Sequence, residues 1–145
     1  MKYACLVYHD EEQLRAVPDG DLDRMIGECM AYVGGLEESG QHVMSSGLQS
    51  PRTATTLRRR DGEISLTDGP FAETKEVLGG FTIIEARDLN EAIQIASKFP
   101  NAKFSSIEVR PLMDPSQEVS DPHDQRIVAS LRRVIACSPV CQPVG

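Results

Sequence analysis

Apolar residues recur with two different periods in this chain, and these periods predict where strands and helices lie. Residues 2–8 carry apolar side chains on both faces of an extended segment, which is typical of a strand covered on both sides. Residues 21–38 instead repeat apolar side chains every three or four positions, which predicts a helix. Gly34 and Gly35 inside it each cost about 1 kcal/mol, which close packing against a sheet would explain. The helix is expected to bury one stripe of Leu22, Met25, Ile26, Cys29, Val33 and Leu36.

Two strand-like segments, 53–60 and 63–68, flank an Asp-Gly pair at positions 61–62, a strong signal for a two-residue hairpin turn. The turn determines which residues face each other, and Leu66 is expected opposite the leucine at position 57. Because alternate side chains of a strand share a face, Asp68 lies on the same side as Leu66. If that side is covered, the carboxylate points inward and needs a hydrogen-bond or charge partner.

The remaining pattern completes a mixed fold. Further strands are expected at residues 42–48, 79–86 and 105–110, and a second helix at 88–99 that ends before Pro100. This order fits an α+β, ferredoxin-like sheet with helices on one face and an inserted β-hairpin. Apolar residues on the other face of the sheet also need a cover. A second copy of the chain is expected to supply it, which gives a symmetric homodimer.

The pattern changes after residues 1–113, which are expected to form one domain, and residues 114–145 follow as a separate segment. Residues 114–124 hold prolines and acids that are typical of a linker. Residues 124–137 predict a short amphipathic helix, which would dock on the dimer or on another protein. Residues 139–145 are expected to be flexible.

Composition and charge exclude several classes of partner. The formal net charge of −7 repels nucleic acid and anionic membranes, and the chain has no tryptophan for base stacking. No apolar run approaches the roughly 20 residues that span a bilayer, and no signal-peptide pattern appears, which favours the cytoplasm. Cys137 and Cys141 lie four residues apart without a histidine cluster, so no metal site is expected. No cofactor-binding fingerprint is present, and no Ser-His-Asp arrangement is recognised.

Residues 68–80, Asp-Gly-Pro-Phe-Ala-Glu-Thr-Lys-Glu-Val-Leu-Gly-Gly, place turn formers, an aromatic ring and charged side chains between two apolar strands. This string resembles the signature of the YCII-related family, in the branch named after Asp-Gly-Pro-Phe. The similarity extends to the opening Met-Lys-Tyr, to Gly-Leu-Gln at 47–49 and to Glu-Val-Arg-Pro at 108–111. The resemblance implies a dimeric α+β barrel and covers the chain as far as about residue 113.

The loop after the hairpin is the candidate site, because loops held by a rigid scaffold often carry function. Asp68 would be a general base or a hydrogen-bond acceptor, and a cation beside a buried carboxylate would shift its pKa. The expected ligand-binding residues are Gly69, Pro70, Phe71, Glu73, Lys75, Glu76, Glu108 and Arg110. In the alternative interpretation the loop begins with a simple turn, its phenylalanine fills the core, and its charges are solvated.

The histidines do not form the catalytic motif of the wider group. Some members of the wider group carry a His-Asp pair with the histidine in the first helix, and this sequence has no histidine there. His9 beside Asp10 is an alternative acid/base pair. His42 opens a strand after a turn and is expected to lie at the surface.

Two functions remain open from the sequence. In the first, a cytoplasmic homodimer binds a small polar molecule near the 68–76 loop and performs acid/base chemistry such as a lyase step, which the resemblance implies. In the second, the protein is a non-catalytic regulatory or accessory partner linked to an extracytoplasmic-function sigma factor, which the resemblance also implies.

Overall fold

The computed structural model describes residues 1–137 of the chain, which divides into one compact unit at Met1–Pro111 and a second that begins at Leu112. Expectations for residues 139–145, and for Cys141 among them, lie outside the described residues. Within residues 1–137 no helix is long and apolar enough to cross a membrane, and no three His, Cys, Asp or Glu side chains are grouped to hold a metal ion.

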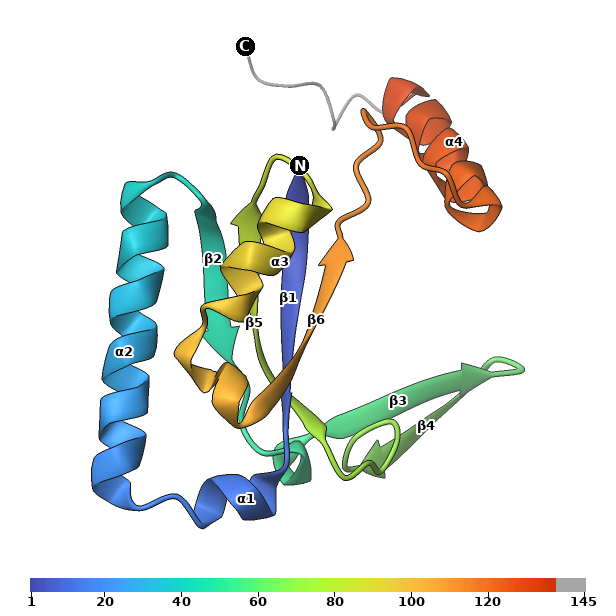
Figure 1. Cartoon of the computed structure of the whole chain (residues 1–145). Coiled ribbons are helices and arrows are strands. Elements are labelled where there is room, and N and C mark those ends of the chain that lie inside the picture. The colour runs from blue at the N-terminus through green and yellow to red at the C-terminus, as the bar shows by residue number, and fades with distance from the viewer. Residues whose placement is uncertain (138–145) are drawn as a thin grey trace. The chain divides into compact units, whose positions relative to one another are not determined.

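The first unit is a mixed α+β fold built on a four-stranded antiparallel sheet (Figure 1). Its strands lie in the order β2-β5-β1-β6, so β1 is central, as its two apolar faces predict. The strands are β1 (Lys2–His9), β2 (His42–Gly47), β5 (Val77–Glu85) and β6 (Ser105–Pro111).

The core lies on one face of this sheet, between the strands and α3 (Leu89–Ser97). Cys5 and Ile84 are completely buried there. Asp88 caps α3 by accepting a hydrogen bond from the backbone N–H of Glu91 at 2.9 Å. The 3-10 turn η2 (Pro100–Lys103) follows. The cluster also contains Tyr3, Leu36, Ala86, Ala92, Ile95, Ala96 and Phe99.

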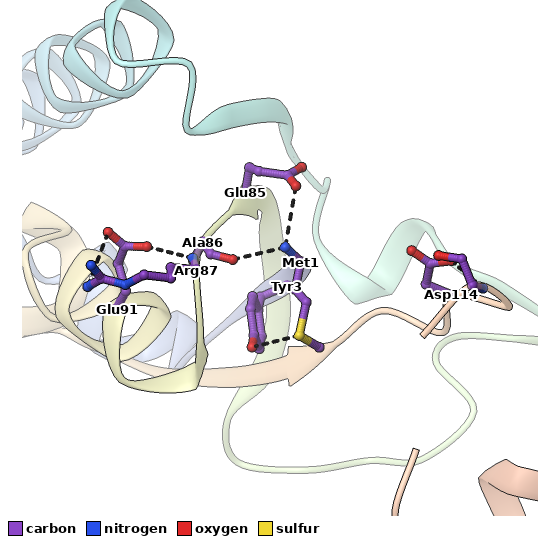
Figure 2. A network of polar contacts seen from close by, with 8 residues as sticks. Met1, Tyr3, Glu85, Ala86, Arg87, Glu91 and Asp114 are labelled. Carbon is purple, nitrogen blue, oxygen red and sulfur yellow. Dashed lines mark hydrogen bonds and ion pairs between the residues drawn. The ribbon is translucent and has the colours of Figure 1, made fainter. Parts of the chain in front are cut away.

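Polar contacts hold the start of β1 against the end of β5 (Figure 2). The Met1 amine donates to the Ala86 carbonyl at 3.0 Å and lies 3.4 Å from the Glu85 carboxylate. In the same region the Arg87 backbone N–H donates to the Glu91 carboxylate at 2.6 Å, which completes the start of α3. These contacts tie the central strand to its neighbour beyond the ladder itself.

The long helix α2 (Asp19–Glu38) corrects the predicted buried stripe. Only Leu36 near its C-terminal end is buried, while Ile26 and Met30 are exposed. Gly34 and Gly35 do not pack closely on the sheet, because a Cβ built on either would meet no atom within 4 Å. The helix therefore stands away from the sheet along most of its length. The short helix α1 (Glu11–Arg15) precedes it.

The hairpin of β3 (Thr55–Arg60) and β4 (Glu63–Asp68) forms a separate two-stranded sheet that extends away from the four-stranded one (Figure 1). Every predicted pair across it is confirmed, including Leu57 with Leu66. The turn residues at 61 and 62 have φ of 51° and 81°, as a type I′ turn needs. Between the hairpin and β2 lies the 3-10 turn η1 (Pro51–Thr53).

The second unit consists of α4 (Pro122–Cys137) and the segment before it. Arg132 of α4 donates to the Pro115 and Gln117 carbonyls at 2.6 and 3.1 Å, and Gln125 donates to the Val119 carbonyl at 2.9 Å. The segment expected as a plain linker is therefore hydrogen-bonded back along the helix. Val128 is buried in this unit.

Candidate functional site

The gap between α2 and the sheet is a cavity of about 570 Å³. Its walls come from β1, α2, β2, β5 and the turn after α3, all within the first unit. Apolar side chains dominate its lining: Val7, Leu14, Met25, Met30, Val33, Phe99 and Phe104. Polar groups are fewer, and they include His9, Cys29, Glu37, Ser45, Thr82 and Asn101. A mostly apolar cavity of this size with a few polar groups suits a small organic ligand.

Tyr32 anchors α2 to the elements that cover the sheet. Its hydroxyl donates to the Ile95 carbonyl of α3 at 2.8 Å, and its ring meets Phe99 edge-to-face at 5.0 Å between centroids. This contact joins the two helices near the C-terminal half of α2. The side of α2 that bounds the cavity runs from Met25 to Glu37, past this contact.

His9 lies in this cavity directly over Gly79 of β5. A Cβ built on Gly79 would lie 1.9 Å from Cε1 and 2.2 Å from Nδ1 of His9, so only glycine leaves room for the imidazole. The ladder between β1 and β5 shifts register here, because Val7 pairs with Gly80 and the next residue of β1 pairs with Leu78. Gly79 is thus the extra residue of a β-bulge. This close approach gives a packing reason for the glycine at position 79.

Two further polar groups lie deep in the cavity wall. The Asn101 side-chain Oδ1 is buried without a hydrogen-bond partner among the described residues, which is a costly arrangement. Burial raises the pKa of the Cys29 thiol, while a hydrogen bond from the Asn101 backbone acts in the opposite direction. The thiol is therefore kept protonated, as in a small apolar side chain.

The structure places the predicted loop residues outside this cavity. Asp68 is exposed at the end of β4, on the same hairpin face as Leu66, so the chain by itself does not turn the carboxylate inward. Gly69 has φ of 100° and donates its backbone N–H to the Ala54 carbonyl at 2.7 Å, which holds the loop against β3. Pro70 is exposed, and Phe71 is 80% exposed, so it does not fill the core.

The rest of the loop runs toward the free face of the four-stranded sheet. Glu73 and Lys75 are exposed, and Glu76 accepts a hydrogen bond from the Ser106 hydroxyl of β6 at 3.2 Å. Arg110 Nε donates to Glu108 at 2.9 Å on the same face, because Ser106, Glu108 and Arg110 alternate along β6. Of the predicted set, Glu76, Glu108 and Arg110 share this face, and Asp68 lies on the hairpin.

None of the nine predicted site residues lines the cavity, but the same signature string closes with Gly79 and Gly80, which do. The His9–Asp10 pair does not form, because the Asp10 carboxylate accepts from the Glu12 backbone at 2.9 Å and caps α1. The signal that would have pointed to the cavity is the histidine at the end of β1 opposite two glycines. His42 is also more enclosed than expected, because its side chain is 11% exposed.

Comparison with known proteins identifies the chain through its first 116 residues. The family model described as the YCII-related domain matches residues 1–116. An uncharacterized protein of Rhizobium meliloti (strain 1021) is 40% identical over 114 residues, which cover 77% of this chain and 92% of that protein. A solved structure of 5-chloro-2-hydroxyhydroquinone dehydrochlorinase from Burkholderia phenoliruptrix AC1100, in complex with 2,5-dihydroxybenzoquinone, is 19% identical. It covers 77% of this chain and 93% of its own, and a TM-score of 0.39 does not establish a common fold.

Proposed function

This chain belongs to the YCII-related family, and we propose that it is a cytoplasmic homodimer that binds a small organic molecule and performs acid/base chemistry on it. The observation that supports this proposal is the cavity of about 570 Å³ between α2 and the sheet. Its apolar lining favours a compact carbon skeleton, and its few polar groups favour a ligand with one or two hydrogen-bonding groups. His9, held over Gly79, lines this cavity and is a candidate proton-transfer group.

The homodimer is proposed from two uncovered apolar surfaces of the first unit. Leu57, Ile64 and Leu66 share one face of the hairpin and are 60%, 60% and 67% exposed. A two-stranded hairpin with such a face is marginal when it is isolated in water. The second surface is the sheet face opposite α3, where Met44 and Leu78 are exposed. A partner copy over the hairpin would also cover Asp68, which shares its apolar face.

The cavity is tested by filling it from α2. Gly34 lines the cavity and has open space around it, whereas Gly35 is exposed and does not line it. Gly34→Leu is expected to fold and to abolish ligand-induced thermal shifts, measured with a panel of small carboxylic acids, esters and hydroxylated aromatic compounds. Gly35→Leu is the matched control, since it adds the same side chain one position away. Equal thermal shifts in both variants would place the ligand elsewhere and would reject this cavity.

The second candidate function is a regulatory partner linked to an extracytoplasmic-function sigma factor. It is favoured by α4, whose Ile127, Val134 and Ile135 are exposed within the second unit. This candidate predicts that removal of residues 114–145 abolishes binding of the sigma factor, while Asp68→Ala and Gly34→Leu leave it unchanged. The first candidate predicts that ligand binding is lost in Gly34→Leu and retained when residues 114–145 are removed.

A further inference from the structure

Three side chains at the edge of the cavity form a connected polar chain. Ser45 Oγ lies 2.9 Å from Nε2 of His42, and the Glu37 Oε1 lies 3.4 Å from Nδ1 of the same ring. The imidazole therefore has a hydroxyl on one nitrogen and a carboxylate on the other. The His42 side chain is 11% exposed, whereas that of Glu37 is 61% exposed, so the ring is the enclosed centre of the group. Ser45 and Glu37 both line the cavity.

A β-bulge in β2 brings His42 and Ser45 to the same side. Residues three apart in a regular strand point to opposite faces, so simple alternation would separate these two. The register of β2 shifts between His42 and Met44, which adds one residue and reverses the alternation. His42 pairs with Ile84 and Ser45 with Thr82, and both of these β5 residues are buried on the helix-covered face.

The tight connection from α2 to β2 supplies the carboxylate. Gly40 has φ of 73°, and the Gln41 backbone N–H donates to the Leu36 carbonyl at 2.8 Å, which ends the helix abruptly. The chain then reverses into β2 at once, so Glu37 on the last turn of α2 lies beside His42 at the first position of the strand. No long loop needs to be ordered to hold the pair together.

We propose that Ser45, His42 and Glu37 form a nucleophilic triad that hydrolyses a small ester bound in the cavity. This inference rests on the proposed function, because it uses the same cavity. The carboxylate on Nδ1 favours the tautomer with Nδ1–H, which leaves Nε2 free to accept the Ser45 proton. Ser45 is the nucleophile, His42 is the general base, and Glu37 is a positioning residue that acts through the ring.

The reaction balances with water as the only co-reactant. Ser45 Oγ bonds to the ester carbonyl carbon while its proton passes to Nε2 of His42. The carbon–oxygen bond to the alcohol then breaks, and the alcohol leaves with that proton. Water next attacks the acyl-serine, again giving a proton to His42, and the carboxylic acid leaves as Ser45 recovers its hydrogen. The apolar lining selects a compact acyl group.

The test uses the full chain with a fluorophosphonate probe and p-nitrophenyl butyrate. Mass spectrometry is expected to find the phosphonyl adduct on Ser45, and ester hydrolysis is expected to fall at least about 100-fold in Ser45→Ala and in His42→Ala. Ser97→Ala, which removes an exposed hydroxyl on α3, is expected to retain wild-type hydrolysis. An adduct on another residue, or hydrolysis retained in Ser45→Ala, overturns the proposal.

Glu37→Gln separates a positioning role from a structural one. The neighbouring Glu38→Gln is its matched control, since both are on the last turn of α2. Glu37→Gln is expected to lower kcat about tenfold with KM unchanged, because the ring of His42 is no longer oriented by a carboxylate while the cavity still binds the ester. Equal kcat values for the two variants overturn the role of Glu37. Thermal shifts with non-hydrolysable carboxylic acids measure ligand binding in the cavity separately. If the wild-type chain binds these acids but the fluorophosphonate probe does not label it, the triad is rejected and the proposed ligand binding stands.

Discussion

Replacement of Gly79 by alanine tests the packing that places His9 in the cavity. The added Cβ would lie 1.9 Å from Cε1 of His9, whereas carbon atoms in contact are roughly 3.5–4 Å apart. Small shifts of the two residues cannot restore a normal contact distance, so the imidazole must leave its position over β5. Overpacking of this kind costs about 1–3 kcal/mol. At about 2.1 cal/mol/K per residue for the unit Met1–Pro111, each kcal/mol lowers Tm by about 4 °C.

A double-mutant cycle measured by thermal unfolding checks this reasoning. Gly79→Ala is expected to lose about 1–3 kcal/mol in the wild-type background and to be neutral or slightly stabilising in His9→Ala, where the ring is absent. Gly80→Ala is the control, because its Cβ would meet the Ser46 carbonyl oxygen at 3.0 Å, which His9→Ala cannot relieve. If His9→Ala fails to rescue Gly79→Ala, the contact does not govern this position and the placement of His9 is wrong.

The remaining predictions concern the core thiol and the dimer. Burial raises the pKa of Cys5 to about 11 from an ordinary value of 9.0, so the folded state keeps this proton to higher pH than the unfolded state does. The resulting stability is complete below pH 9 and is lost as pH rises toward 11. The free energy of unfolding measured with urea should therefore fall across this window, and Cys5→Ala should reduce that fall. For the dimer, Leu66→Asp is expected to weaken self-association at least about tenfold in sedimentation experiments, because it charges the apolar hairpin face. Ser65→Asp on the other face should leave it unchanged. A wild-type chain that sediments only as a monomer contradicts the dimer.

Local rules in the sequence predicted the elements whose partners are close along the chain. The hairpin register followed from one Asp-Gly turn, because a two-residue turn leaves no freedom in which residues pair. The second helix, expected at 88–99, forms at Leu89–Ser97 with Asp88 as its cap. The central place of β1 followed from apolar residues on both of its faces, since only a paired and covered strand tolerates them.

The sequence could not predict how far α2 stands from the sheet. Its apolar stripe is real, but periodicity says which side of a helix is apolar and not whether that side is filled. Met25 of the stripe therefore lies in the cavity wall rather than in a packed core. For the same reason Gly34 was expected to pack closely and instead has free space beside it. The cavity arises because α2 stands away from the sheet, and no local sequence pattern predicts that separation.

Both bulges of the sheet border the cavity, and each changes which side chains the strands present to it. In β5 the extra Gly79 opens the space that His9 occupies, and in β2 the shift after His42 brings Ser45 to the helix-covered face. Alternation holds between the bulges, where it places Cys5 of β1 and Ile84 of β5 in the core. The two bulges lie toward opposite ends of β5, one at Gly79 and one opposite Ile83 and Ile84, so His9 and Ser45 enter the cavity lining at two separate places. This coincidence of two bulges with one cavity favours a binding or catalytic role over a packing defect, because bulges that served only the sheet's twist would have no reason to aim polar side chains into the same space.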